Sequence, residues 1–124
     1  MKLLVINGAS GSGKTTLAQA LTEHIANLVW IHPDGLMDTP GMSAEEIFEL
    51  SLARVDLESD EVFVIDCQIR PGAALDLLQS HSIKTYVLVL LDCPRQVREQ
   101  RLTERGWTTE AFDRIEEWAN VLLE

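Results

Sequence analysis

Short apolar runs alternate along the chain with longer segments of mixed polarity. The runs at residues 3–6, 28–32, 61–66 and 85–92 have the length of β-strands, and loops or turn signals separate them from the longer segments. The run "TYVLVLLD" at 85–92 is almost unbroken, which predicts a strand buried on both faces of its sheet. The pattern therefore predicts about four strands with helical segments between them.

In the longer segments, apolar residues recur at the spacing of an amphipathic helix. The predicted helices span about residues 14–27, 43–52, 71–80, 94–105 and 108–122. Ser43 and Glu46 have the spacing of a capping box at the start of the second helix, and Pro71 suits the first turn of the third. Gly106 is expected to end the fourth helix. Regular alternation of strand and helix predicts an α/β three-layer sandwich, a parallel sheet with helices on both faces.

Composition agrees with a single domain over residues 1–124, because 46% hydrophobic residues are enough for a core. The formal net charge of -10 argues against general nucleic-acid binding, which needs many Lys and Arg contacts to phosphates. Cys67 and Cys93 form no CxxC pair and are expected to be small buried residues of a reducing compartment. No apolar segment suits a signal peptide or a membrane span, so a soluble cytoplasmic protein is expected.

The stretch "NGASGSGKTT" at 7–16 comes directly after the first predicted strand and begins the first predicted helix. It fits the Walker A pattern G-x-x-x-x-G-K-[ST] of a phosphate-binding loop in its required context. Its glycines let successive backbone N–H groups face one anion, and the helix start adds its positive dipole end. Lys14 can follow the transferring phosphate, and the Thr15 hydroxyl can hold Mg²⁺. The residues expected to bind the nucleotide phosphates are Gly8, Ala9, Ser10, Gly11, Ser12, Gly13, Lys14, Thr15 and Thr16.

This loop resembles the first segment of the small P-loop kinases, which include nucleoside monophosphate kinases, dephospho-coenzyme A kinase, gluconate kinase and the kinase domains of polynucleotide kinases. The stretch "VLVLLDCPRQVREQRLTERG" at 87–106 is similar to the fourth strand of these kinases and the arginine-bearing helix that leads into their lid. The resemblance implies a P-loop kinase fold and phosphoryl transfer from ATP with Mg²⁺. Because members differ in their acceptor, it implies the type of reaction more firmly than the substrate.

Carboxylates stand at the ends of the predicted strands, where an open parallel sheet binds its ligands. The resemblance implies that Asp34 contacts the acceptor or receives its hydroxyl proton, with Asp38 a weaker candidate; a simple turn residue is an equal alternative for Asp34. Asp66 ends the third strand, where P-loop proteins place a carboxylate that holds Mg²⁺. The resemblance also implies that Arg70 faces the acceptor. Asp92 is expected to cap the next helix and to stay outside the site.

Arg98, Arg101 and Arg105 lie on the predicted fourth helix, spaced three and four residues apart. These spacings put them near one face, where they can converge on one anion. Guanidinium groups suit phosphate oxygens and stabilise the charge of a transition state. Arg101 and Arg105 match the family pattern best and are the predicted catalytic arginines. A solvated face paired with neighbouring acidic residues is the alternative.

The chain departs from the family pattern towards its end. Members usually continue to a fifth strand and a loop that packs on the nucleobase, whereas no fifth strand is predicted before Glu124. The sheet is therefore expected to have an uncovered edge. A homodimer in which a second subunit covers this edge is one solution.

The sequence thus predicts a small ATP-dependent kinase whose acceptor is a hydroxyl or phosphate of a small molecule or nucleotide. Two alternatives stay open. The missing fifth strand favours a nucleotide-binding regulatory module without catalysis, and the order of Asp66 and Arg70 permits a kinase of polynucleotide ends, which the acidic charge disfavours. The predicted catalytic residues are Lys14, Asp34, Arg101 and Arg105, and the predicted Mg²⁺ ligands are Thr15 and Asp66.

Overall fold

Strands and helices alternate through the part of the chain that the computed structural model describes, namely residues 1–9, 12–32, 41–106, 116 and 120. The strands are β1 (Lys2–Asn7), β2 (Leu28–Ile31), β3 (Val62–Cys67) and β4 (Tyr86–Leu90). The helices are α1 (Lys14–His24), α2 (Ala44–Leu52), α3 (Pro71–Ser80) and α4 (Arg95–Glu104). The predicted order of elements is confirmed. The predicted last helix, from Thr108, lies outside the described residues apart from Glu116 and Asn120.

The four strands form one parallel sheet in the order β2-β3-β1-β4. β1 lies inside the sheet, where Ile6 pairs with Asp66 of β3 and Asn7 pairs with Leu90 of β4. Since all strands are parallel, their carboxyl ends lie at the same edge of the sheet. The segments after β1 and β3, which carry the phosphate-binding loop and Arg70, therefore begin side by side.

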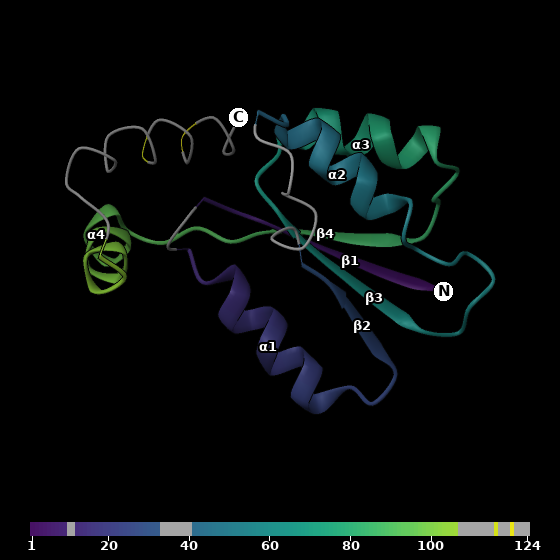
Figure 1. The fold of residues 1–124 in the computed structure, drawn as a ribbon, viewed down its shortest axis with the longest axis horizontal. Coiled ribbons are helices and arrows are strands. Elements are labelled where there is room, and N and C mark those ends of the chain that lie inside the picture. Colours follow the sequence, from purple (N-terminus) through teal and green to yellow (C-terminus); the bar gives the residue numbers. More distant parts are fainter. Residues whose placement is uncertain (10–11, 33–40, 107–115, 117–119, 121–124) are drawn as a thin grey trace.

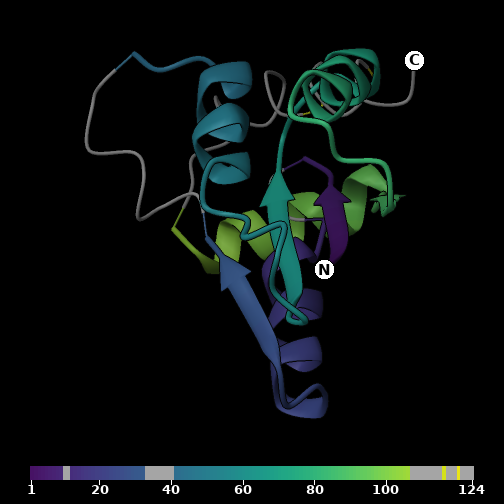
Figure 2. The same cartoon turned by 90° about the vertical axis from the view of Figure 1, so that its right-hand side faces the viewer.

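Helices cover both faces of this sheet, as the α/β three-layer prediction requires (Figure 1). One face carries α1, and the other carries α2 and α3; the view turned by 90° shows the same three layers (Figure 2). The core under α2 and α3 is the larger, and its buried residues are Leu3, Val5, Ile31, Phe48, Leu52, Val55, Phe63, Ile65, Cys67, Ile69, Ala74, Leu78 and Ile83. Under α1 the buried residues are Ile6, Ala18 and Val64. Alternate residues of β1 thus face opposite cores, as a strand with two covered faces demands.

The predicted helix ends are formed by local chemistry. Ser43 caps α2: its Oγ accepts a hydrogen bond from the backbone N–H of Glu46 at 3.1 Å and donates to the Glu46 carboxylate at 3.2 Å. Pro71 occupies the first turn of α3, where a backbone N–H would have no hydrogen-bond partner within the helix, so the N–H that proline lacks is not needed. Gly106 comes after α4 with φ +82°, a left-handed conformation that glycine adopts without strain.

The prediction that the fourth strand is buried on both faces is wrong. β4 is an edge strand, and its residues Val87 and Leu90 are 58% and 39% exposed. An unbroken apolar run is the usual mark of a strand inside a parallel sheet, but the run itself does not determine where the strand lies in the sheet order. The described residues contain no helix long and apolar enough to cross a membrane.

Arg98 fixes α4 beyond the carboxyl ends of the strands, where Figure 1 shows this helix. Its side chain is 4% exposed and forms ion pairs with Asp92 at 2.8 Å and Glu116 at 2.6 Å. It also donates a hydrogen bond to the carbonyl of Cys93 at 2.7 Å. Two expectations are corrected by these contacts. Arg98 is a structural anchor that does not join the other two arginines, and Asp92 pairs with it instead of capping α4.

We predict that Arg98→Met lowers the free energy of unfolding by about 3 kcal/mol. The substitution removes the buried cation and leaves the carboxylates of Asp92 and Glu116 without the charge that compensates them. Urea denaturation measures this loss. Arg95→Met is the matched control, since Arg95 is 48% exposed and its pair with Glu99 is worth about 0.5 kcal/mol. Equal losses in the two variants would contradict the anchoring role.

Candidate functional site

The phosphate-binding loop begins at the end of β1, where Asn7 ties it to β3. Asn7 is 1% exposed; its side-chain amide donates to the carbonyl of Ile69 at 2.6 Å and accepts from the backbone N–H of Ile69 at 3.0 Å. The N–H of Gly8 donates to the carbonyl of Cys67 at 3.2 Å. These bonds fix the start of the loop against the segment after Asp66. Sequence reasoning missed Asn7, because its partner lies 62 positions away.

Two of the loop glycines are required by the geometry. A Cβ atom on Gly8 would lie 2.6 Å from the carbonyl oxygen of Leu91 and 2.6 Å from the Ser12 hydroxyl, which leaves no room for a side chain. Gly13 has φ +101° and precedes α1, with no side chain capping the helix. The first N–H groups of α1 are thus turned towards the loop without a capping side chain in front of them.

Ser12 carries an unsatisfied polar atom inside this loop. The residue is 8% exposed, and its hydroxyl has no hydrogen-bond partner among the described residues. A buried hydroxyl without a partner costs free energy unless a ligand or water supplies one. An anionic oxygen bound in the loop suits this hydroxyl and the helix start together. Ser10 and Gly11, also predicted to bind phosphate, lie outside the described residues.

Lys14 points back over the loop that precedes it. Its ammonium donates to the carbonyl of Ala9 at 3.2 Å. Burial lowers the pKa of Lys14, the Asp66 carboxylate partly offsets this effect, and the charge of Arg105 adds to it. Burial also raises the pKa of the neighbouring Cys67 thiol to about 12, so this thiol stays protonated. Cys67 is buried as predicted, whereas the same prediction for Cys93 is wrong, because Cys93 is only partly buried. A dianionic ligand would relieve the desolvated charge of Lys14.

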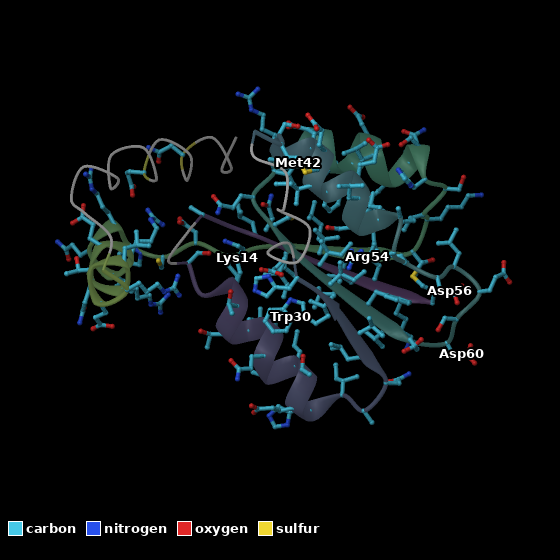
Figure 3. The ribbon with its side chains drawn as sticks, in the orientation of Figure 1. Lys14, Trp30, Met42, Arg54, Asp56 and Asp60 are labelled. Carbon is cyan, nitrogen blue, oxygen red and sulfur yellow. The ribbon has the colours of Figure 1, made fainter. Side chains whose placement is uncertain are left out.

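Asp66 lies at the end of β3 and is 3% exposed. Its carboxylate accepts a hydrogen bond from the indole N–H of Trp30 on β2 at 2.8 Å. The Trp30 ring also packs against His32, with ring centroids 4.8 Å apart. Figure 3 shows Lys14 and Trp30 on the same half of the molecule, away from Asp60, which precedes β3. Trp30 on β2 therefore supplies a hydrogen bond to the buried carboxylate, and Lys14 at the start of α1 supplies an opposite charge.

Trp30 is a residue that sequence reasoning missed. A signal existed: a tryptophan in an apolar strand needs a partner for its N–H, and it stands close to the end of that strand. The partner could not be identified, however, because the pairing of Trp30 with Val64 depends on the strand order. His32 is partly buried and packs against the Trp30 ring.

Arg101 and Arg105 lie close to the loop. A Cβ atom on Gly13 would be 3.4 Å from a guanidinium nitrogen of Arg101, and the charge of Arg105 lowers the pKa of Lys14. Both side chains are exposed, unlike that of Arg98. The helix rises about 1.5 Å per residue, so Arg98 is displaced by about 10 Å along the axis from Arg105 and reaches Asp92 instead. The structure thus brings two of the three arginines to the loop.

The structure describes three of the remaining predicted site residues and leaves two outside its described part. Thr15 and Thr16 are exposed in the first turn of α1, and Arg70 is exposed just before α3. Asp34 and Asp38 lie outside the described residues. The described residues contain no group of three or more His, Cys, Asp or Glu side chains that could hold a metal ion by themselves.

We predict that Trp30→Phe lowers the free energy of unfolding by about 2 kcal/mol, because a buried carboxylate oxygen loses its donor while an aromatic ring is kept. Denaturant titration measures the loss. The same substitution made in an Asp66→Asn background gives the matched comparison and should cost clearly less, since the acceptor is then neutral. Equal costs in both backgrounds would show that the indole acts only by packing.

Solved structures show the same fold. A chain of the Pnkp1/Rnl/Hen1 RNA repair complex matches with a TM-score of 0.77 and 21% identity over 98% of this chain and 44% of that one. The tunicamycin resistance protein of Deinococcus radiodurans matches with a TM-score of 0.74 and 23% identity, over 99% and 80% of the two chains. A gluconokinase from Sinorhizobium meliloti 1021 gives 0.71 and 20%, over 94% and 74%. This chain therefore spans less than half of the RNA repair protein that it matches.

The sequence itself matches no curated protein. A family model described as an AAA domain matches residues 4–119, a range that contains the phosphate-binding loop, Asp66 and the arginines of α4. The family model and the solved structures together confirm the small P-loop kinase-like fold that the sequence resemblance implied. The chain therefore belongs to the AAA domain family.

Proposed function

We propose that this protein is an ATP-dependent kinase that transfers the γ-phosphoryl group to a hydroxyl or phosphate of a small molecule or nucleotide. The observation that carries the proposal is the gathering of opposite charges at one loop. The charge of Arg105 lowers the pKa of Lys14, the buried Asp66 carboxylate opposes this effect, and Arg101 lies beside Gly13. Phosphoryl transfer depends mostly on positioning and electrostatic stabilisation, which such an arrangement supplies.

The loop is proposed to hold the phosphates of the nucleotide. The unpartnered Ser12 hydroxyl and the uncapped start of α1 are donors that fit anionic oxygens. The Lys14 ammonium, which in this structure bonds to the Ala9 carbonyl, is placed to turn to the β- and γ-phosphates. The residues proposed to bind the phosphates are those predicted from the sequence, residues 8–16.

Thr15 and Asp66 are the proposed ligands of Mg²⁺. Mg²⁺ in nucleotide sites is held by one or two protein groups together with substrate phosphates and water, so a complete cage of protein ligands is not needed. Asp66 fits this role because Trp30 engages only one of its carboxylate oxygens. Bound Mg²⁺ neutralises charge on the transferring group. Trp30 orients the carboxylate for it.

Arg101 and Arg105 are proposed to stabilise the charge that develops on the transferring group. A guanidinium nitrogen of Arg101 lies near Gly13, and Arg105 is close enough to lower the pKa of Lys14. Neither side chain is buried, so both can move towards a ligand. Asp34 is the proposed base: it receives the proton of the acceptor hydroxyl as the new oxygen–phosphorus bond forms and ADP leaves. Asp34 lies outside the described residues, and the proposal for it rests on the sequence.

A polynucleotide end is the second candidate acceptor, favoured by the likeness to the RNA repair protein. The small-molecule candidate is favoured by the likeness to the gluconokinase. The formal net charge of -10 favours the small-molecule candidate, because it repels a polyanion but only weakly affects a small acceptor. A small molecule or a nucleotide is therefore the preferred class.

We predict that Lys14→Ala weakens the binding of ATP with Mg²⁺ at least tenfold from a micromolar dissociation constant, about -8 kcal/mol, and lowers the rate of ADP formation by about a hundredfold. Calorimetric titration and a coupled ADP assay measure the two effects. The free energy of unfolding should change little, because the variant also removes a desolvated charge. Lys2→Ala, which changes an exposed lysine at the start of β1, is the control. An unchanged phosphoryl-transfer rate in Lys14→Ala would contradict the proposed kinase function.

We also predict that small acceptors, and not oligonucleotides, raise the rate of ADP formation. The assay compares sugar acids, polyols, nucleosides and nucleoside monophosphates with a 5′-hydroxyl oligonucleotide at low and high salt. If the protein is a polynucleotide kinase, the logarithm of its affinity for the oligonucleotide should fall linearly with the logarithm of the salt concentration. The slope should be about -0.7 for each phosphate contact, which is a steep loss of affinity with salt. Stimulation by the oligonucleotide together with that slope would replace our preferred acceptor class. Nucleotide binding that no acceptor converts into faster ADP formation would favour the regulatory module.

A further inference from the structure

The outer edge of β4 presents backbone groups that no described residue pairs with. The N–H of Leu91 donates to the carbonyl of Asn7 on β1 at 2.7 Å. Because successive residues of a strand turn their N–H and C=O groups to opposite sides, residues 87 and 89 also face β1. The N–H and C=O groups of Tyr86, Leu88 and Leu90 therefore face outwards from the sheet. β4 is the last strand in the sheet order, so these groups are available for pairing within the described part of the chain.

This edge lacks the features that normally block pairing. Natural edge strands are protected by proline, by inward-pointing charges, by bulges or by a short length. The sequence of β4 is YVLVL, with no charge and no proline, and Val87 and Leu90 are 58% and 39% exposed. An exposed apolar edge of this kind is typical of a strand that pairs with another strand.

We propose that β4 pairs antiparallel with β4 of a second copy of this chain, with Leu88 on the two-fold axis. In this register Tyr86 is opposite Leu90 of the partner subunit, and Leu88 is opposite its own copy. These are the residues whose N–H and C=O groups face outwards, so each opposed pair exchanges hydrogen bonds. Val87 is opposite Val89 of the partner subunit on the face that carries α1, so its exposed side chain becomes covered.

Charge complementarity selects the second copy and its direction. Between residues 84 and 92 the only charged residues are Lys84 at one end and Asp92 at the other. The same register places Lys84 opposite the partner's Asp92, and the symmetry forms this contact twice. Asp92 is paired with Arg98 but is still 44% exposed. A parallel arrangement would instead set like charges beside each other, which is unfavourable.

Sedimentation equilibrium of the full chain over a range of concentrations tests this interface. We expect a reversible dimer with twice the 13.9 kDa mass of one chain. Val87→Lys should raise the dimer dissociation constant at least tenfold, because a charged side chain would be buried at the centre of the interface. Leu57→Lys is the matched control: it makes the same change at a residue that is 49% exposed outside β4, and should leave the constant unchanged.

Lys84→Glu tests the register by a second route. It changes only an exposed side chain, so it leaves the fold of the subunit intact even if Val87→Lys should misfold, which circular dichroism would reveal. It should weaken the dimer at least threefold by placing a carboxylate opposite the partner's Asp92. A protein that stays monomeric at all concentrations, or a dimer that tolerates Lys84→Glu, overturns the proposal. Neither outcome depends on the kinase activity, so this proposal and the proposed function fail separately.

Discussion

The burial of the Asp66 carboxylate is the constraint around which the candidate site is arranged. A carboxylate that is 3% exposed is costly unless hydrogen bonds and opposite charge compensate it. Trp30 on β2 supplies the hydrogen bond, and Lys14 at the start of α1 supplies a compensating positive charge. Because the compensating groups come from two other elements, the buried charge fixes how β2, β3 and α1 meet at the carboxyl end of the sheet.

The arginines of α4 divide between structure and site according to their position along the helix. The chain has 20 acidic and 10 basic residues, so a cation is easily neutralised by a neighbour. Arg98, in the first turn of α4, is enclosed by Asp92 and Glu116 and holds the helix in place. Arg101 and Arg105, one and two turns later, reach the loop. Arg98 thus fixes the direction in which α4 projects Arg101 and Arg105. As a result, these two arginines form a local positive region on an acidic protein.

Local signals explain which features could be predicted from the sequence. The Ser43 cap, the Pro71 start and the Gly106 end all depend on residues a few positions apart, and all three were predicted correctly. Contacts between distant segments could not be predicted. The partner of Trp30 requires the strand order, and the exposure of β4 requires knowing which strand lies at the edge. For the same reason, three arginines near one helical face were predicted to share a target although their heights along the axis differ.

β4 connects the proposed interface with the candidate site. Its carboxyl end forms a wall of the loop, since the Leu91 carbonyl leaves no room for a side chain at Gly8, and Asp92 holds Arg98 at the start of α4. Its inner edge bonds to β1, which leads into the same loop. Substitutions at inward-facing positions of β4 would therefore disturb pairing and site together. Val87 and Lys84 differ in this respect, because their side chains are exposed and they lie at or before the start of β4, whereas the loop and α4 adjoin its carboxyl end. Only such positions can separate what the strand does for association from what it does for the loop.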